Sequence, residues 1–130
     1  MPLVKISLRK GTSPEYRKVI LDGIHSALVE AFLIPDSDRH QQIYELDEDN
    51  FEIPSTRSTR FVVIEIIAFH GRSLQAKKKL YHAIARNLGN SPGIPDNDIL
   101  IILHEPPVES WCIPEGKPAS KTGVGFRIDV

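Results

Sequence analysis

The sequence predicts an α/β (α+β) domain in which a β-α-β unit occurs twice and forms one four-stranded sheet with two helices on one face. The first observation is that the chain of 130 residues matches itself without a gap when it is shifted by 60 positions. The second is that each half contains an apolar strand, a helical pattern and another strand. The third is that two strands are nearly continuous apolar runs, which is typical of strands buried on both faces. Because two helices cover only one face, we expect other copies of the chain to cover the second face.

The internal repeat is carried by identical residues at equivalent positions. An ungapped match of this length indicates a duplication, which divides the single domain 1–130 into four parts. These are repeat 1 (2–46), a linker (47–59), repeat 2 (61–105) and a carboxy-terminal tail (106–130). The identical pairs include Gly11 and Gly71, Ser13 and Ser73, Ile24 and Ile84, Asp38 and Asp98, and Glu45 and Glu105.

Each element of the first repeat has a local reason to form. Val4, Ile6 and Leu8 alternate along a short first strand. The segment 13–15 begins a helix, because it offers a capping serine and then a proline at the first helical position. Apolar residues follow at helical spacing, the segment 35–38 ends the helix, and residues 42–46 form the second strand.

The second repeat follows the same plan. Residues 61–69 form its first strand, residues 71–73 form a turn, residues 73–88 form its helix, and residues 99–104 form the returning strand. The crossovers are expected to be parallel and right-handed. The linker is polar and rich in acidic, serine and threonine residues, which predicts a mobile loop.

Composition excludes several classes of protein. The formal net charge of −1 gives no reason to expect a nucleic acid or a membrane as partner. Cys112 is the only cysteine, and the five histidines show no tight ligand spacing, so we expect neither a disulfide framework nor a metal site. No apolar run is long enough to span a membrane and no signal-peptide pattern follows Met1, which predicts a cytoplasmic protein.

Pro2 stands at the start of the first strand, directly after Met1. Removal of Met1 is expected and leaves a free prolyl amine. An α-amino group titrates near pH ~8, so modest changes in its surroundings make it a useful base or nucleophile at neutral pH. The alternative is that Pro2 is only a strand-edge residue, a position that proline tolerates well.

The terminal proline, the β-α-β duplication and the self-associating sheet together resemble the tautomerase superfamily. Local matches to its malonate semialdehyde decarboxylase-like branch lie in residues 22–32, 35–39 and 71–73, and in Trp111 with Gly116. The resemblance implies a 4-oxalocrotonate tautomerase-like (MIF-like) fold, a homotrimer, no cofactor, and a small keto or enol acid as substrate. It also implies that Pro2 is catalytic.

Two residues of the second turn are candidates through this resemblance. Arg72 matches an arginine that binds or polarises the substrate, and a guanidinium there can grip a carboxylate with two hydrogen bonds. The alternative is a solvated arginine at a helix start. The decarboxylase-like branch has a second arginine two residues earlier, where this chain has His70. That departure weakens the match to the decarboxylases.

Asp38 and His25 are candidates from the first repeat. Asp38 matches an aspartate proposed to act on water or on the substrate. Since Asp98 holds the same place in repeat 2, the alternative is that Asp38 organises a turn through its side chain. Arg39 follows Asp38 and is a candidate ion-pair partner for it. His25 lies beside the apolar stripe of the first helix, where related dehalogenases place a catalytic histidine; its alternative is a packed or surface residue.

The tail supplies Trp111 and Ile113 as candidate substrate-binding residues. The resemblance implies that the tail forms a wall over a neighbouring subunit's pocket, with Ile113 where an aromatic residue is usual. The alternative is that Trp111 anchors an interface. We therefore expect a cofactor-independent tautomerase with Pro2, Arg72 and Asp38 as catalytic residues. The alternatives are a decarboxylase or hydratase with a protonated Pro2, and a non-catalytic trimeric binding module.

Overall fold

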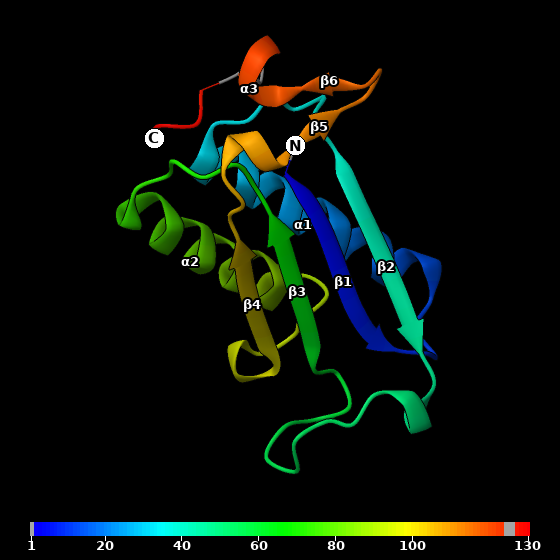
Figure 1. The fold of residues 1–130 in the computed structure, drawn as a ribbon. Helices are drawn as coiled ribbons and strands as arrows, with labels where there is room; N and C mark the ends of the chain where they lie inside the picture. Colours follow the sequence, from blue (N-terminus) through cyan, green and yellow to red (C-terminus); the bar gives the residue numbers. More distant parts are fainter. Residues whose placement is uncertain (1, 124–126) are drawn as a thin grey trace.

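The chain forms a four-stranded mixed sheet with the strand order β2-β1-β3-β4. A computed structural model describes residues 2–123 and 127–130. The two long helices, α1 and α2, lie on the same face of the sheet (Figure 1). The inner strands β1 and β3 are antiparallel, whereas each outer strand runs parallel to its inner neighbour. The predicted fold class is confirmed.

The first β-α-β unit consists of β1 (Leu3–Arg9), α1 (Pro14–Phe32) and β2 (His40–Leu46). The helix begins where the sequence predicts, because the Ser13 side chain accepts a hydrogen bond of 3.1 Å from the Tyr16 backbone N–H. Strand β2 begins two residues earlier than predicted.

The second unit consists of β3 (Val62–Ile67), α2 (Leu74–Asn90) and β4 (Ile99–His104). Here Ser73 caps the helix and accepts a hydrogen bond of 3.1 Å from the Ala76 backbone N–H. Helix α2 continues two residues past its predicted end. The same capping device therefore starts both helices.

Short elements lie at both ends of the sheet. The tail gathers at the end where β1 begins, and the linker lies at the opposite end (Figure 1). The short elements are η1 (Glu48–Asn50), η2 (Asp96–Asp98), η3 (Val108–Ser110), β5 (Cys112–Ile113), β6 (Lys117–Pro118) and α3 (Ala119–Thr122).

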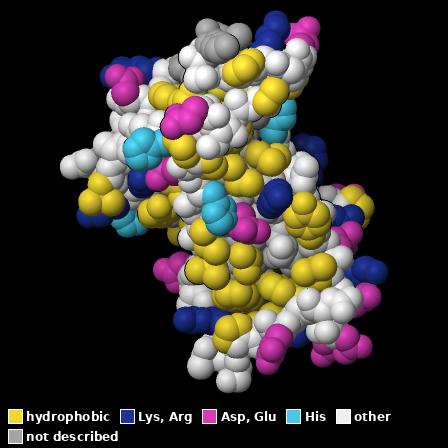
Figure 2. Space-filling model, in the orientation of Figure 1, with side chains coloured by type: hydrophobic (Ala, Val, Ile, Leu, Met, Phe, Trp, Pro, Cys, Tyr) yellow, Lys and Arg dark blue, Asp and Glu magenta, His cyan; other side chains and the backbone are white. Residues whose placement is uncertain are grey.

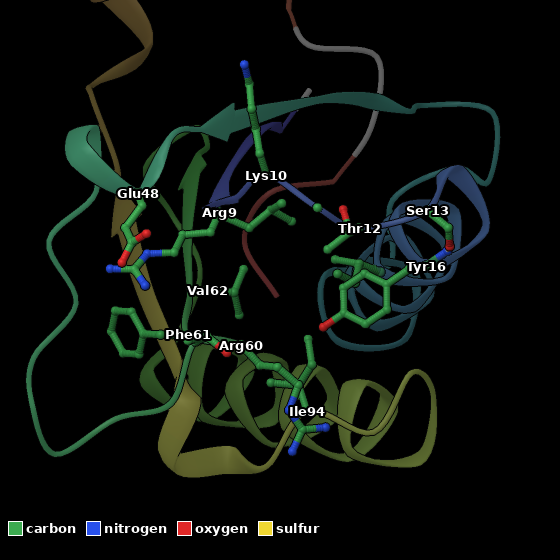
Figure 3. Close-up of a pocket in the computed structure, with 14 residues that line it drawn as sticks. Arg9, Lys10, Thr12, Ser13, Tyr16, Glu48, Arg60, Phe61, Val62 and Ile94 are labelled. Carbon is green, nitrogen blue, oxygen red and sulfur yellow. The ribbon is translucent and has the colours of Figure 1, made fainter.

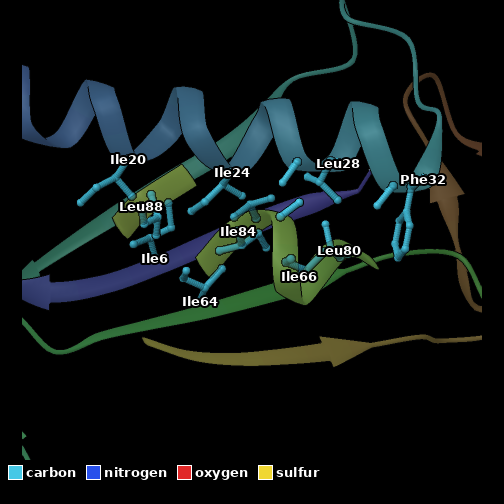
Figure 4. Packing of buried hydrophobic residues seen from close by; sticks show 14 of the residues in the cluster. Ile6, Ile20, Ile24, Leu28, Phe32, Ile64, Ile66, Leu80, Ile84 and Leu88 are labelled. Carbon is cyan, nitrogen blue, oxygen red and sulfur yellow. The ribbon is translucent and has the colours of Figure 1, made fainter. Parts of the chain in front are cut away.

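The hydrophobic core fills the layer between the sheet and the two helices (Figure 4). Alternate residues of β1 and β3 enter it, as do residues at helical spacing from α1 and α2. The helices approach closely at Gly23, where an added Cβ would lie 3.2 Å from Leu88 Cδ2. Fully buried members include Ile6, Ile20, Ile24, Leu28, Ile64, Ile66, Leu80, Ile84 and Leu88.

The second face of the sheet is uncovered in a single chain. Leu100 and Ile102 of β4 are 44% and 38% exposed there. Figure 2 shows apolar side chains along this face, interrupted by charged ones. Among these, His104 Nε2 lies 3.2 Å from Glu65 Oε1. The apolar runs therefore leave a partly apolar surface, and its burial by other copies of the chain stays a prediction.

The linker is tied to both repeats, which its polar composition did not indicate. Arg9 of β1 donates a hydrogen bond of 3.2 Å from Nη2 to the Phe51 carbonyl. The Ser58 backbone N–H and hydroxyl donate to the carboxylate of Asp98, at 3.0 and 2.6 Å. These bonds hold the linker against the end of the sheet.

Candidate active site at the start of the first strand

Strand pairing brings separate segments together at the start of β1. In the antiparallel pair, Leu3 lies opposite Ile67, so Pro2 lies beside the end of β3. In the parallel pair, Leu3 lies opposite His40, so Pro2 also lies beside the segment that enters β2. Pro2 is buried. Met1 lies outside the described residues, and its removal stays a prediction.

Arg72 is buried in the turn between β3 and α2, with only 5% of its surface exposed. Gly71 precedes it with φ of +144°, a conformation that favours glycine. Arg72 Nη1 donates a hydrogen bond of 3.1 Å to the Phe69 carbonyl. The guanidinium lies 4.7 Å from the centroid of the Phe32 ring, which is the geometry of a cation–π contact. These contacts hold the charge in one place.

Two carboxylates lie near this guanidinium. Burial lowers the pKa of Arg72 from its ordinary value, while Glu105 and then Asp38 act in the opposite direction. Arginine stays protonated in proteins at neutral pH, so the site combines a fixed positive charge with two acids.

Glu105 is the site residue that the sequence did not single out. It directly follows β4, and its Oε1 pairs with Lys77 Nζ at 2.6 Å. Its Oε2 is buried and has no hydrogen-bond partner within the described part of the chain. The only available signal was that Glu105 is identical to its repeat partner Glu45.

Asp38 lies in the turn between α1 and β2. Its backbone N–H donates to the Pro35 carbonyl at 3.0 Å, and its side chain is 15% exposed. His40 Nε2 lies 3.5 Å from Asp38 Oδ1. The expected ion pair between Asp38 and Arg39 is wrong, because Arg39 reaches back to α1 and pairs with Asp22 at 2.9 Å.

His25 is buried on α1 and bonds to the same turn. Its Nε2 lies 2.8 Å from the Asp36 backbone carbonyl oxygen and 3.3 Å from Asp36 Oδ1. Since a carbonyl oxygen only accepts hydrogen bonds, Nε2 carries the proton. The structure thus joins His25 to the turn that contains Asp38. Its predicted contact with a substrate stays a prediction.

The remaining candidates differ in exposure. His70 is exposed in the turn before Arg72. Trp111 packs against Phe69, with 4.4 Å between ring centroids, and its Nε1 donates to the Pro106 carbonyl. Ile113 is half-buried in β5. Trp111 therefore covers the residue that accepts the hydrogen bond from Arg72 within the same chain, and a role over a neighbouring subunit stays a prediction.

The described part of the chain has neither a cluster of metal-binding side chains nor a membrane-spanning helix. Within residues 2–123 and 127–130, no group of three or more His, Cys, Asp or Glu side chains is arranged to hold a metal ion. In the same part of the chain, no helix has the length and apolar character needed to cross a membrane.

Comparison with protein families gives matches along most of the chain. Residues 38–114 match the model of a family described as "Tautomerase enzyme", and residues 2–60 match a second model with the same description. The probable tautomerase YusQ of Bacillus subtilis (strain 168) is 30% identical over 122 residues, which cover 90% of this chain and 96% of YusQ. The probable tautomerase YrdN of the same organism is 29% identical over 127 residues, which cover 95% and 98%.

Solved structures give similar matches. FG41 malonate semialdehyde decarboxylase inhibited by 3-bromopropiolate has a TM-score of 0.86 and 29% identity, covering 97% of this chain and all of that one. A malonate semialdehyde decarboxylase studied for its decarboxylase and hydratase activities has a TM-score of 0.85 and 28% identity, covering 94% and 98%. A symmetric trimer of wild-type fused 4-OT has a TM-score of 0.83 and covers 95% of this chain and all of that one; at 18% identity the likeness concerns the fold alone.

Proposed function

The chain belongs to the tautomerase family, and we propose that it is a cofactor-independent tautomerase of small keto and enol acids. Pro2 is the proposed general base and Arg72 the proposed carboxylate-binding residue. The observation that carries this proposal is that both groups are buried at the same end of the sheet, Pro2 at the start of β1 and Arg72 after the end of β3. Buried ionisable groups that share a site are typical of acid–base catalysis.

In the proposed reaction, the neutral amine of Pro2 removes a proton α to the carbonyl and returns it to another atom of the conjugated system. The substrate is isomerised and no atom is gained or lost. Arg72 binds the carboxylate, and its positive charge stabilises the enolate as negative charge develops. The contacts of Arg72 with Phe32 and Phe69 support this role, because a donor that is already held in place does not have to be reoriented during the reaction. Asp38 is proposed to act on the substrate or on water.

The second candidate is a decarboxylase or hydratase, and the likeness to two malonate semialdehyde decarboxylases favours it. In that mechanism Pro2 stays protonated, polarises the 3-carbonyl and stabilises the enolate formed as carbon dioxide leaves. His70 stands where the decarboxylase-like branch has an additional arginine, and it is exposed. We therefore expect enol–keto conversion of 2-hydroxydienoate or phenylenolpyruvate substrates to be faster than decarboxylation of malonate semialdehyde. Much faster decarboxylation would favour the second candidate.

The decisive test concerns the amine of Pro2. Pro2→Ala keeps a terminal amine with different basicity, and we expect turnover of an enol substrate to fall by roughly 10²–10⁴-fold, the usual contribution of a positioned base. A matched protein retains Met1 because a bulky residue is inserted after it, and its intact mass is verified. If this protein turns over substrate as fast as the processed one, Pro2 has no role and the non-catalytic module becomes the better interpretation.

We also propose that the chain assembles as a homotrimer through the uncovered face of its sheet. Leu100, Ile102 and Tyr44 expose apolar surface there, and fused 4-OT, which shares the fold, forms trimers. Sedimentation equilibrium should give a trimer at micromolar concentration, and Ile102→Glu should shift it toward monomer because a charge cannot be buried cheaply without a partner. A stable wild-type monomer would contradict this assembly.

A further inference from the structure

A cavity of about 560 Å³ lies at the opposite end of the sheet from Pro2 (Figure 3). The end of β1, the start of α1, the linker and the start of β3 line it. Three of its lining positions correspond, through the shift of 60 residues, to the candidate active site. They are Val62, which corresponds to Pro2, Gly11, which corresponds to Gly71, and Thr12, which corresponds to Arg72.

The turn at Gly11 has a backbone similar to that of the turn at Gly71. Gly11 has φ of +110° where Gly71 has +144°. Ser13 and Ser73 have nearly the same backbone angles, and each caps its helix with a hydrogen bond of 3.1 Å. The duplication has therefore built the same turn and helix start at each end of the sheet.

In the candidate active site the arginine lies in the turn before the helix, whereas the arginines of the cavity lie outside the equivalent turn. Arg60 directly follows the linker, and its Nη1 donates to the Gly93 carbonyl at 2.8 Å. Arg9 donates to a linker carbonyl rather than to an acid. The backbone thus holds both guanidinium groups without neutralising their charge.

Acidic groups balance these charges only in part. Lys10 points away from the cavity in Figure 3 and pairs with Asp47 at 3.2 Å. Glu48 is the acidic side chain among the lining residues, and it lies on the side of Arg9. Asp98 lies outside the lining, and its carboxylate interacts electrostatically with Arg60. Within the lining itself, Arg9 and Arg60 outnumber the one carboxylate, which leaves a positive charge in excess.

The remaining lining combines one hydroxyl with an apolar floor. The Tyr16 hydroxyl points into the cavity (Figure 3). Burial raises the pKa of Tyr16, partly offset by Arg60, so the hydroxyl is neutral at pH 7 and can donate a hydrogen bond. Four buried apolar residues complete the floor: Leu8, Ile20, Val62 and Ile94.

We propose that this cavity binds a small molecule with an apolar body and one carboxylate, and that it binds the molecule without converting it. Arg60 and Tyr16 meet the carboxylate, and the apolar floor meets the body. The volume falls in the range of small-molecule sites, roughly 300–1,000 Å³. We expect no conversion, because Val62 holds the place of Pro2 and its nitrogen is a peptide amide, which cannot act as the base that Pro2 provides. The proposal does not depend on the catalytic role of Pro2.

The test is a titration of the isotopically labelled full chain with 3-phenylpropanoate, followed by amide chemical shifts in NMR spectra. We expect saturable shifts at Gly11, Thr12 and Val62, read separately from those at Gly71 and Ser73. The neutral analogue 3-phenylpropanamide should bind at least about tenfold more weakly, because a hydrogen bond to a charged group contributes about 1.5–3 kcal/mol. Equal binding of the two compounds, or no shift near Gly11, overturns the proposal.

Variants assign the binding to the cavity. Arg60→Gln should weaken binding by about tenfold or more, and Arg60→Lys should restore part of it. Arg57→Gln removes the same charge from a nearby position in the linker, outside the lining, and should leave the affinity unchanged. Tyr16→Phe, which keeps the ring, should weaken binding by a smaller factor even if Arg60→Gln disturbs the linker. The proposal is wrong if Arg60→Gln and Tyr16→Phe both bind as well as the wild type.

Discussion

The two ends of the sheet have the same architecture and different chemistry. Each has a glycine turn, a capping serine and an ion pair in the same place, Arg17 with Glu45 at one end and Lys77 with Glu105 at the other. Only one end has a buried arginine in the turn and a proline at the start of its strand. The comparison teaches that the duplication determines where a site can form, whereas a few side chains decide what each site can do.

The largest effect expected from this comparison concerns Arg72 and its equivalent Thr12. Arg72→Gln should lower kcat/KM for an enol substrate by about 10–100-fold, because it removes charge-assisted hydrogen bonds to the carboxylate. Thr12→Ala, the matched change at the other turn, should leave kcat/KM nearly unchanged. Steady-state kinetics measures both, and thermal unfolding shows whether Arg72→Gln is folded. Equal losses in the two variants would mean that the turns are not chemically different.

The next effect concerns Asp38 and its equivalent Asp98, which we expect to differ in role. Asp98 is 2% exposed and accepts both hydrogen bonds from Ser58. Asp98→Ala should therefore lower the free energy of unfolding by about 1.5–3 kcal/mol, with little change in activity per folded molecule. Asp38→Ala should instead lower activity and change stability less. Urea unfolding and kinetics on the two variants test this, and a mainly structural effect of Asp38→Ala would remove Asp38 from the proposed site.

The smallest effect is a difference in acid stability. Hydrogen bonds from Ser58 lower the pKa of Asp98 below its ordinary value of 3.8. A carboxyl group with a lowered folded pKa stabilises the fold above its unfolded pKa and loses that contribution as the pH falls through its folded pKa. The stability advantage of the wild type over Asp98→Asn should thus be constant above about pH 5 and shrink below about pH 4. A stability advantage that does not change with pH would contradict the lowered pKa of Asp98.

Much of the fold could be predicted from local patterns. Ser13 caps the first helix as the sequence predicts, because a capping hydrogen bond joins residues three positions apart. Ser73, which the sequence placed at the first position of the second helix, caps that helix in the same way. The alternation in β1 placed its buried face correctly. The continuous apolar run of β3 predicted burial on both faces, whereas in the single chain its residues alternate between buried and half-buried. The linker was less predictable, because its order depends on bonds to Arg9 and Asp98, which lie far from it in the sequence.

The candidate site was predictable only in part. The resemblance selected Pro2, Asp38 and Arg72, and strand pairing and burial are consistent with a shared site. Glu105 was missed, because a single acid after a strand carries no motif. His25 was selected for chemistry, whereas its ring nitrogen is bonded to the backbone of the turn after α1, a contact that no spacing in the sequence indicates.

The sequence by itself determined the duplication, the order of the elements and the positions of the turns, because these depend on periodicity and capping between near neighbours. Only the tertiary structure decided that Phe32 contacts Arg72, that Ser58 donates hydrogen bonds to Asp98, and that Arg60 lines the cavity at the end of β1. Ser58 and Asp98 are 40 positions apart in the chain. Such contacts arise from strand pairing and helix packing, so two repeats with the same pattern acquired different surroundings.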